Sequence, residues 1–297
     1  MAAGSVLTAE AELLPAAVEL VGKPRLSRLA VSNTTALVGL TIIAVVLVVA
    51  IAAPLLAPSD PNAQDVLHQF QSPSVHHLLG TDQFGRDELS RIIFGARVSV
   101  LTSVAVGAAI LGIGILVGIV SGLAGGLVDG AIMRAVDVLL AFPSLLLALA
   151  VAGTLGPGLL HLALAMTAVW WVDYARIVRG LVLGAKEQPH IESARAIGMT
   201  RTRLVFRHVL PSIAPPVVVL ATLQTARLLL ALAALSFLGL GVAPPTAEWG
   251  AMLNDGKNFL DTAPQLMLYP GLAITITALG FNLLGEGLRD VLDPNLK

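Results

Sequence analysis

The class of fold is decided by the stretch Thr35-Ala-Leu-Val-Gly-Leu-Thr-Ile-Ile-Ala-Val-Val-Leu-Val-Val-Ala-Ile-Ala-Ala-Pro-Leu-Leu56, which holds no charged side chain. An α-helix needs about 20 consecutive apolar residues to cross the hydrocarbon layer of a bilayer. A run of this length is too long for a β-strand and too long for the apolar part of a cleavable signal peptide. The stretch therefore predicts a membrane-spanning helix.

The composition of the whole chain agrees with a membrane protein. Of its 297 residues, 56% are hydrophobic and 12% are charged, whereas a soluble domain is about 25% charged. The chain has no cysteine, which excludes a disulfide-linked secreted scaffold. A net charge of −1 provides no overall basic field for a nucleic acid. We therefore expect an integral membrane protein that does not bind nucleic acid.

Five further apolar runs predict, with the first, an all-α, polytopic bundle of six transmembrane helices. They extend over about Val98–Val120, Val138–Thr154, Gly158–Val178, Ser212–Leu238 and Met267–Leu284. The six runs divide the chain into an N-terminal segment, 1–34, and a transmembrane domain, 35–297.

The distribution of basic residues predicts the orientation, because cytoplasmic segments are enriched in Lys and Arg. With both termini inside, the cytoplasmic segments hold thirteen of the 18 basic residues, namely Lys23, Arg25, Arg28, Arg134, Arg176, Arg179, Lys186, Arg195, Arg201, Arg203, Arg207, Arg289 and Lys297. The opposite orientation would leave only four inside. The segment 1–34 and the C-terminus are therefore expected in the cytoplasm.

The first long connection, 58–97, is expected outside the cell as an elbow. Its pair His76-His77 and the nearby carboxylates offer a candidate metal site, although adjacent residues on an extended chain point to opposite faces. The alternative is a turn-rich elbow with bends at Gly80 and Gly85. The end of the connection, Asp87–Arg97, predicts a helix at the membrane surface with its arginines at headgroup level.

The second connection, 180–211, is expected in the cytoplasm and is rich in basic residues. Its pattern predicts two short amphipathic helices that meet at Gly198. Ile191, Ala194 and Ile197 share one face of the first helix. A surface that binds another protein accounts for this apolar stripe, and a helix that lies on the bilayer is the alternative.

The third connection, 239–265, is expected outside the cell. It contains Pro244, Pro245, Trp249 and Gly250. Trp249 either anchors the chain at the membrane interface or closes over a vestibule, and the sequence leaves both alternatives open.

A stripe of small residues predicts close helix packing in the second span. Gly114, Gly118, Gly122 and Gly126 repeat every four residues and therefore share one face of a helix. We expect the backbone of another helix, from this chain or another, to pack on that face.

Polar residues in the spans are candidates for function, because ionisable groups in a membrane usually face a cavity or a partner. Arg227 and Gln224 lie within the fifth run and are expected to face a pore or a subunit interface. Asp173 lies near the cytoplasmic end of the fourth run and is expected to pair with Arg176 or Arg179.

No motif for catalysis is present. The chain lacks the Gly-x-x-x-x-Gly-Lys-Ser/Thr phosphate loop, the zinc motif His-Glu-x-x-His and the Gly-x-Ser-x-Gly nucleophile elbow. We therefore expect a protein that is not an enzyme, with no cofactor and no metal of its own.

Four parts of the chain carry a family resemblance. In the second connection, Glu192-Ser-Ala-Arg-Ala-Ile-Gly198 is followed by His208-Val-Leu-Pro211. The other three are Leu78-Leu-Gly-Thr-Asp-Gln-Phe-Gly-Arg-Asp-Glu-Leu-Ser-Arg91, Leu235-Ser-Phe-Leu-Gly-Leu-Gly241 and Asn282-Leu-Leu-Gly-Glu-Gly-Leu-Arg-Asp-Val-Leu-Asp-Pro294. The first is similar to the "EAA" motif of importer permeases. Together they resemble the second permease subunit of bacterial ABC importers of the dipeptide, oligopeptide and nickel family.

The resemblance implies the MetI-like permease fold and a role for two sets of residues. The second connection would supply coupling helices for an ATP-binding subunit, through Ile191, Glu192, Ser193, Ala194, Gly198, His208 and Pro211. The first connection would hold the external signature of the family, Gly80, Thr81, Asp82, Gly85, Arg86 and Asp87. Two positions depart from the family pattern: Ser193 replaces an alanine of the motif, and Leu232 stands where many relatives have glutamate.

The resemblance also implies partners and a function. The partners are a second homologous permease, two ATP-binding subunits that hold ATP and Mg²⁺, an external substrate-binding protein and the lipid of the bacterial inner membrane. We expect the two permeases to form the pathway for dipeptides or oligopeptides and to couple closure of the ATPase subunits to alternating access. Import of nickel or another small solute is the alternative within the family. A stand-alone secondary transporter or channel is a further alternative.

Overall fold

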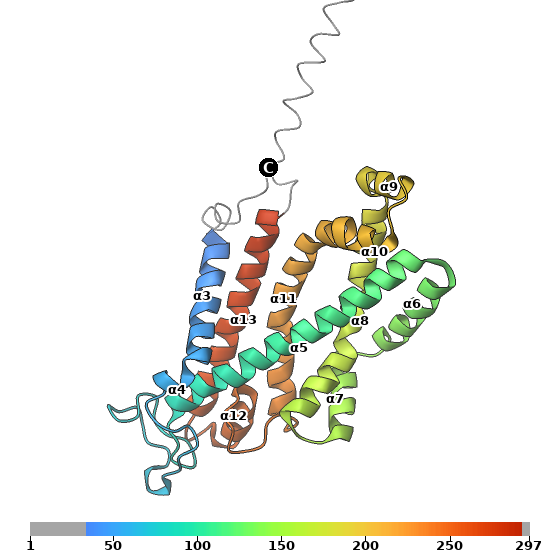
Figure 1. Ribbon diagram of the computed structural model, residues 1–297. Helices are drawn as coiled ribbons and strands as arrows, with labels where there is room; N and C mark the ends of the chain where they lie inside the picture. The colour runs from blue at the N-terminus through green and yellow to red at the C-terminus, as the bar shows by residue number, and fades with distance from the viewer. Residues whose placement is uncertain (1–33, 293–297) are drawn as a thin grey trace, which may run out of the picture.

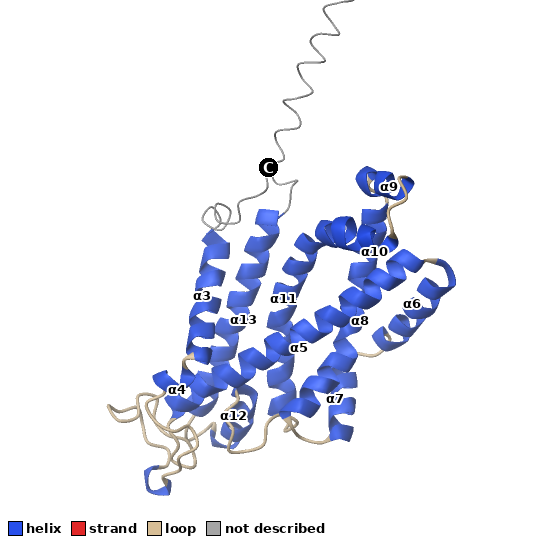
Figure 2. Ribbon diagram, in the orientation of Figure 1, coloured by secondary structure: helices blue, strands red, loops and turns tan. Residues whose placement is uncertain are grey.

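The computed structural model describes residues 34–292, and every regular element in that range is helical (Figure 2). The long helices are α3 (Thr34–Ile51), α5 (Glu88–Ala124), α8 (Leu159–Lys186), α11 (Leu210–Phe237) and α13 (Gln265–Leu292). The shorter ones are α4 (Ala53–Leu56), α6 (Gly126–Leu140), α7 (Ser144–Leu155), α9 (Pro189–Ala196), α10 (Arg201–Leu204) and α12 (Trp249–Gly256), with the turns η1 (Val66–His68), η2 (Val205–Val209) and η3 (Lys257–Phe259). The predicted all-α class is confirmed. The predicted segment 1–34 lies outside the described residues except for Thr34.

The long helices extend between two ends of the molecule, which we name the α9 end and the α12 end after the elements found there (Figure 1). α13 packs between α3 and α11, and α5 crosses them obliquely and packs along α8. α3 begins at the α9 end and α13 finishes there, so the first and last described residues share that end (Figure 1).

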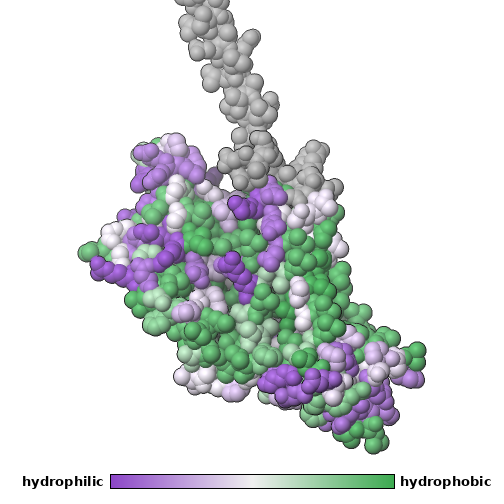
Figure 3. Space-filling view, turned by 180° about the vertical axis from the view of Figure 1, so that it is seen from behind, coloured by the Kyte–Doolittle hydropathy of each residue, from purple (hydrophilic) through white to green (hydrophobic). Residues whose placement is uncertain are grey.

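Four described helical segments are long and apolar enough to cross a membrane: α3, α5, the segment Arg201–Phe237 and α13. α6 and α7 make a fifth candidate if they are counted as one span with a bend of 84°. α8 has 28 residues but includes Asp173, Arg176, Arg179 and Lys186, which set it apart in composition. A broad hydrophobic belt lies between hydrophilic ends (Figure 3). The count of six spans stays a prediction.

The predicted third span, Val138–Thr154, is not a straight helix. α6 ends at Leu140, α7 begins at Ser144, and Pro143 is the residue that precedes α7. Proline disfavours the helical conformation in the residue before it, which is Phe142 here, and it has no N–H to continue a helix. The chain therefore turns sharply between two shorter helices.

The segment Arg201–Phe237 is one continuous helical segment assembled from α10, η2 and α11. η2 is a π-helical turn of five residues, and Pro215 and Pro216 lie inside α11. Wide turns of this kind are rare and occur often at functional sites. The second predicted helix of the connection 180–211 is therefore continuous with α11 and lies across its end (Figure 1).

The glycine stripe of α5 packs against α8. A Cβ atom added at each glycine would overlap α8, at 2.3 Å from Tyr174 Cβ for Gly114, 2.8 Å from the Ala175 carbonyl oxygen for Gly118 and 2.7 Å from Val182 Cγ1 for Gly122. Close packing on this stripe is confirmed, and the partner helix belongs to the same chain. Gly126 does not take part, because it begins α6 and a Cβ there would meet nothing within 4 Å.

Candidate functional site

The external signature, Gly80–Asp87, forms a compact turn at the α12 end. Thr81 and Asp87 make an isolated antiparallel bridge. Gly80 and Gly85 have positive φ angles of 81° and 72°, a conformation that glycine adopts without strain. A Cβ on Gly85 would lie 1.8 Å from the carbonyl oxygen of Asp65. The predicted bends at both glycines are confirmed.

Asp82 is the centre of a buried ion-pair cluster. Its Oδ1 accepts hydrogen bonds from the backbone N–H groups of Phe84 and Arg86, at 2.8 and 3.0 Å. Its Oδ2 lies 2.5 Å from Arg86 Nε and 3.5 Å from Arg91 Nε. Asp255 of α12 lies 3.5 Å from Arg86 Nη2 and 3.8 Å from Arg91 Nη2. Burial raises the pKa of the Asp255 carboxyl, and the two guanidinium groups oppose that rise.

Arg91 connects three segments of the α12 end. Besides its ion pairs, its Nη1 donates to the carbonyl oxygens of Pro61 and Pro245, at 3.2 and 3.1 Å. The helix predicted over Asp87–Arg97 is present, but it is the beginning of α5, which starts at Glu88 and continues without a break, and the expected surface position of Arg91 is wrong because Arg91 is buried. Arg91 points into the protein, where carboxylates and carbonyl groups replace the water it loses.

Helix α12 is fixed against α5 by two buried residues. Glu248 caps α12 by accepting hydrogen bonds from two backbone N–H groups of its first turn, at 3.0 and 2.8 Å. It also accepts one from Ser99 Oγ of α5, at 2.8 Å. Trp249 is buried, and its Nε1 donates to the Ile92 carbonyl at 3.0 Å. Both predicted roles of Trp249 are wrong, because each needs an exposed ring.

Of the two adjacent histidines, His77 contacts the start of α5. Its Nδ1 lies 2.9 Å from Asp87 Oδ1, and Asp87 caps α5 by accepting a hydrogen bond from the Ser90 N–H at 2.8 Å. Within residues 34–292, no three His, Asp or Glu side chains form a group that could hold a metal ion. His77 and Asp87 therefore join the elbow to α5.

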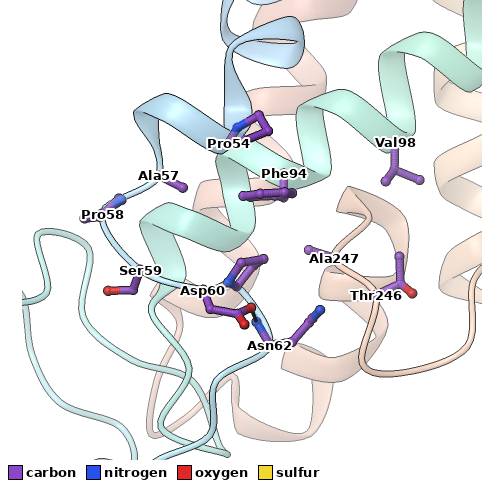
Figure 4. Close-up of a pocket in the computed structure, with 11 residues that line it drawn as sticks. Pro54, Ala57, Pro58, Ser59, Asp60, Asn62, Phe94, Val98, Thr246 and Ala247 are labelled. Carbon is purple, nitrogen blue, oxygen red and sulfur yellow. Dashed lines mark hydrogen bonds between the residues drawn. The ribbon is translucent and has the colours of Figure 1, made fainter.

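An open pocket of about 600 Å³ lies at the α12 end. In Figure 4, Phe94 and Val98 of α5 line it opposite the segment 54–62, with Thr246 and Ala247 beside them. Asp60, the one charged lining residue in the described range, accepts a hydrogen bond from the Asn62 N–H at 2.9 Å. The lining combines apolar side chains with the polar Ser59, Asp60, Asn62 and Thr246.

At the opposite end, α9 is seated on the body of the protein through its apolar face. Ile191 is fully buried and Ala194 is nearly so, and both pack in one cluster with Val182 of α8 and Val209 of η2. The prediction that this stripe forms an exposed docking surface needs correction, because its first two residues face this chain's own helices. Only Ile197, which is 81% exposed, remains accessible.

The exposed side of the connection 180–211 is mixed in character. Glu192 and Ser193 are exposed on α9, and Gly198 has a φ of 80° between α9 and α10. Phe206 is 69% exposed and was not singled out from the sequence. An open hollow of about 500 Å³ is lined by Thr200, Thr202, Arg203, Phe206 and Arg207. The signal that could have identified Phe206 is a large apolar residue within a basic run.

The two remaining predicted residues of this connection lie where α9 meets α11. His208 is in η2, and its ring centroid is 6.2 Å from that of His190. Pro211 is exposed in the first turn of α11. Beside it, Ser212 Oγ donates to Gln188 Oε1 at 3.3 Å. The structure thus brings the predicted coupling residues together at one end of the molecule.

In the middle of the molecule, Arg227 is exposed on α11, and its Nη1 donates to Gln224 Oε1 at 3.4 Å. Asp173 of α8 is half-buried and makes no ion pair within 4 Å with any described residue. Its predicted pairing is wrong, because Arg176 and Arg179 instead bind aspartates of α6. The predicted signature lies at the α12 end and the predicted coupling residues lie at the α9 end, and Arg227 lies along α11 between these two ends.

Of the two positions at which the sequence departs from the family pattern, Ser193 is exposed on α9 and Leu232 is buried. Leu232 is fully buried in the main apolar core with Leu228 and Leu235. A leucine here therefore completes the packing of α11 and leaves no side chain for contact with a solute.

Comparison with known proteins gives two family models that match this chain. One is described as the binding-protein-dependent transport system inner membrane component and matches residues 114–297. The other is described as the N-terminal TM domain of oligopeptide transport permease C and matches residues 29–73.

Several curated relatives match most of the chain. A putative peptide transport system permease protein of Brucella suis is 42% identical over 264 residues, or 88% of each chain. A dipeptide transport system permease protein of Alkalihalophilus pseudofirmus is 42% identical over 265 residues, or 89% of this chain and 87% of the relative. A glutathione transport system permease protein of Escherichia coli is 45% identical over 255 residues, or 84% and 83%.

Proposed function

Because the chain belongs to the family of binding-protein-dependent transport system inner membrane components, the permease subunits of ABC importers, we propose that it forms half of a pathway for peptides through the bacterial inner membrane. The other half would be a related permease. Two ATP-binding subunits would hydrolyse ATP, and an external binding protein would deliver the substrate. This chain would hold neither ATP nor Mg²⁺ and would convert the motion of its partners into alternating access.

The choice of a peptide as substrate is supported by the relatives. Their printed names specify peptide, dipeptide and glutathione transport, and one family model is named for oligopeptide transport. The exposed arginine in the middle of α11 also suits a polar solute better than a lipid-facing surface.

The coupling role rests on one observation, the way in which α9 is held. Its buried face, with Ile191 and Ala194, is locked onto α8 and η2, whereas Glu192 and Ser193 face outward. A force on the outward face is therefore passed to the long helices, because a packed interface does not deform continuously. Ile191 and Ala194 act as positioning residues, and Glu192, Ser193, Ile197 and Phe206 form the contact surface for the ATP-binding subunit.

Charge reversal on α9 tests this role. The complex is purified through a tag on this chain and reconstituted in proteoliposomes with the binding protein, and uptake of a radiolabelled dipeptide is measured beside ATP hydrolysis. Glu192→Lys places a wrong charge on the contact surface, so uptake should fall about tenfold, which corresponds to about 1.4 kcal/mol of lost coupling, while hydrolysis continues. Gly198→Pro should have the same effect, because proline cannot adopt its φ of 80°.

Glu187→Lys is the matched control, because Glu187 is an exposed acid that precedes α9. Uptake by this variant should stay within about twofold of the wild type, as expected for an exposed charge. Unchanged transport by both Glu192→Lys and Gly198→Pro would refute the coupling role. Purification of the tagged chain without an ATP-binding subunit would favour a stand-alone transporter.

A further inference from the structure

Arg227 is a cation in the middle of a membrane-spanning helix. The helical segment that contains it, Arg201–Phe237, is apolar enough to cross a bilayer. By helical rise, Arg227 lies about 15 Å from the end of α11 at Phe237, which places it well inside a hydrocarbon layer about 30 Å thick. A charged side chain at this depth is costly in contact with lipid and usually faces protein or water.

Arg227 is exposed, although the residues beside it on α11 are buried. Its neighbours Ala226, Leu228 and Leu229 are buried against the other helices, whereas Arg227 itself is exposed. Hydrophilic residues interrupt the hydrophobic belt on the face opposite that of Figure 1 (Figure 3). Arg227 therefore projects from an uncovered face of α11.

The Arg227 guanidinium has hydrogen-bond donors that no group of this chain occupies. Within residues 34–292, its only side-chain hydrogen bond is the 3.4 Å contact with Gln224 Oε1. That contact uses the acceptor of the amide and leaves its NH₂ group free to donate. An array with a positive charge and free N–H groups fits an anionic acceptor, and a guanidinium matches the two oxygens of a carboxylate.

A carboxylate of this chain is close but does not occupy the array. Asp173 of α8 is near enough for the charge of Arg227 to act on it, yet no Arg227 nitrogen lies within 4 Å of its oxygens. A closed pair would neutralise both groups, as Arg179 and Asp129 do at 2.5 Å. The open arrangement keeps the guanidinium available.

We propose that Arg227 and Gln224 form a binding site for the carboxylate of the transported peptide, on the surface of α11 that lines the pathway. The inference rests on the proposed function, since it requires a peptide in that pathway. A permanent ion pair with a carboxylate of the partner permease is the competing assignment. The free donors of Gln224 and the nearby, unpaired Asp173 favour a ligand that enters and leaves.

Direct binding tests the site without the selectivity of the external protein. The complex of wild-type chain and partners is purified without the binding protein, and equilibrium binding of radiolabelled dialanine is compared with that of its C-terminal amide. The wild type should bind the free carboxylate about tenfold more tightly than the amide, as expected for one charge-assisted contact. Arg227→Gln should abolish this preference, and Arg227→Lys should retain part of it.

Three results would overturn the site: no preference for the carboxylate in the wild type, an equal loss of both ligands in Arg227→Gln, or loss of the partner permease from the purified Arg227→Gln complex. The last result would assign Arg227 to the subunit interface. Uptake of dialanine by wild-type proteoliposomes with the binding protein is measured in parallel. Absence of that uptake would refute the proposed function, whereas uptake without a carboxylate preference would refute only the site.

Discussion

Arg91 and Arg97 lie six positions apart on α5 and have the same side chain, but their surroundings differ. Arg91 is buried between Asp82, Asp255 and two carbonyl oxygens. Arg97 is exposed and makes no ion pair with any described residue. A buried charge is tolerated only when its partners replace water. The contribution of Arg91 to stability therefore depends on carboxylates supplied by two other segments.

Replacing each of these two arginines compares the contribution of a buried charge to stability with that of an exposed charge. Arg91→Met should lower the free energy of unfolding by about 3 kcal/mol, because it leaves Asp82 and Asp255 with one cation in place of two. Arg97→Met should change it by less than about 1 kcal/mol. Thermal unfolding of both variants in detergent, followed by tryptophan fluorescence, checks this, and equal shifts would show that the ion-pair cluster does not stabilise the α12 end.

Single residues were predictable where their role is local. Gly80 and Gly85 bend the chain within their own turn, and both bends were expected. The partner of Arg86 and Arg91 in α12, Asp255, was not, because no sequence pattern links residues that meet only through the packing of α5 against α12. The inward orientation of Ile191 was missed for the same reason: amphipathic spacing identifies an apolar face but not what covers it.

At the scale of whole helices, the contact between α5 and α8 depends on missing side chains. Gly114, Gly118 and Gly122 leave no Cβ atoms between the two backbones. Without a hydrophobic driving force inside a bilayer, helices associate through this close packing. The position of α8, and with it that of α9, is therefore set by the glycines of α5.

A larger side chain in this contact should separate the two helices. Gly118→Leu should destabilise the protein by about 3 kcal/mol or more, because the added atoms overlap the backbone of Ala175. Gly112→Leu on the same helix is the control, since a Cβ there meets nothing within 4 Å and should cost less than about 1 kcal/mol. Unfolding midpoints in detergent provide the comparison, and a tolerated Gly118→Leu would contradict the packing.

Helices were predicted well where composition alone decides them. The first, fifth and sixth apolar runs correspond to α3, α11 and α13. The continuity of α5 from Glu88 into the second span was missed, because the charges of its first turns indicated a separate helix at the membrane surface. The break at Pro143 was also missed, because hydropathy records how apolar a segment is and not its direction.

For the whole molecule, the arrangement of ends agrees with the predicted topology. The first and last described residues lie at the end that carries α9, and the signature lies at the other (Figure 1). The distribution of basic residues then predicts that the α9 end faces the cytoplasm. The even number of predicted spans and the distribution of basic residues predicted this arrangement. The bend between α6 and α7 was seen only in the structure.

Labelling of single cysteines tests the orientation directly, because the chain has none of its own. Gln69→Cys and Glu187→Cys place thiols on exposed residues at the two ends, both outside the proposed contact surface. A membrane-impermeant maleimide added to spheroplasts should modify Gln69→Cys at once and Glu187→Cys only after permeabilisation. Ser103→Cys, which is buried in α5, should stay unmodified in both cases. The reverse pattern would invert the topology.

The continuity of the helical segment Arg201–Phe237 has a mechanical consequence. Arg201 belongs to the exposed connection and Arg227 to the middle of the span, about 39 Å away along one helix. The segment bends where η2 joins α11 (Figure 1), so a displacement of Arg201 would move α11, and Arg227 with it, through that bend. In the proposed carboxylate site, release from Arg227 would then follow movement at the α9 end, and the timing of release would be set there.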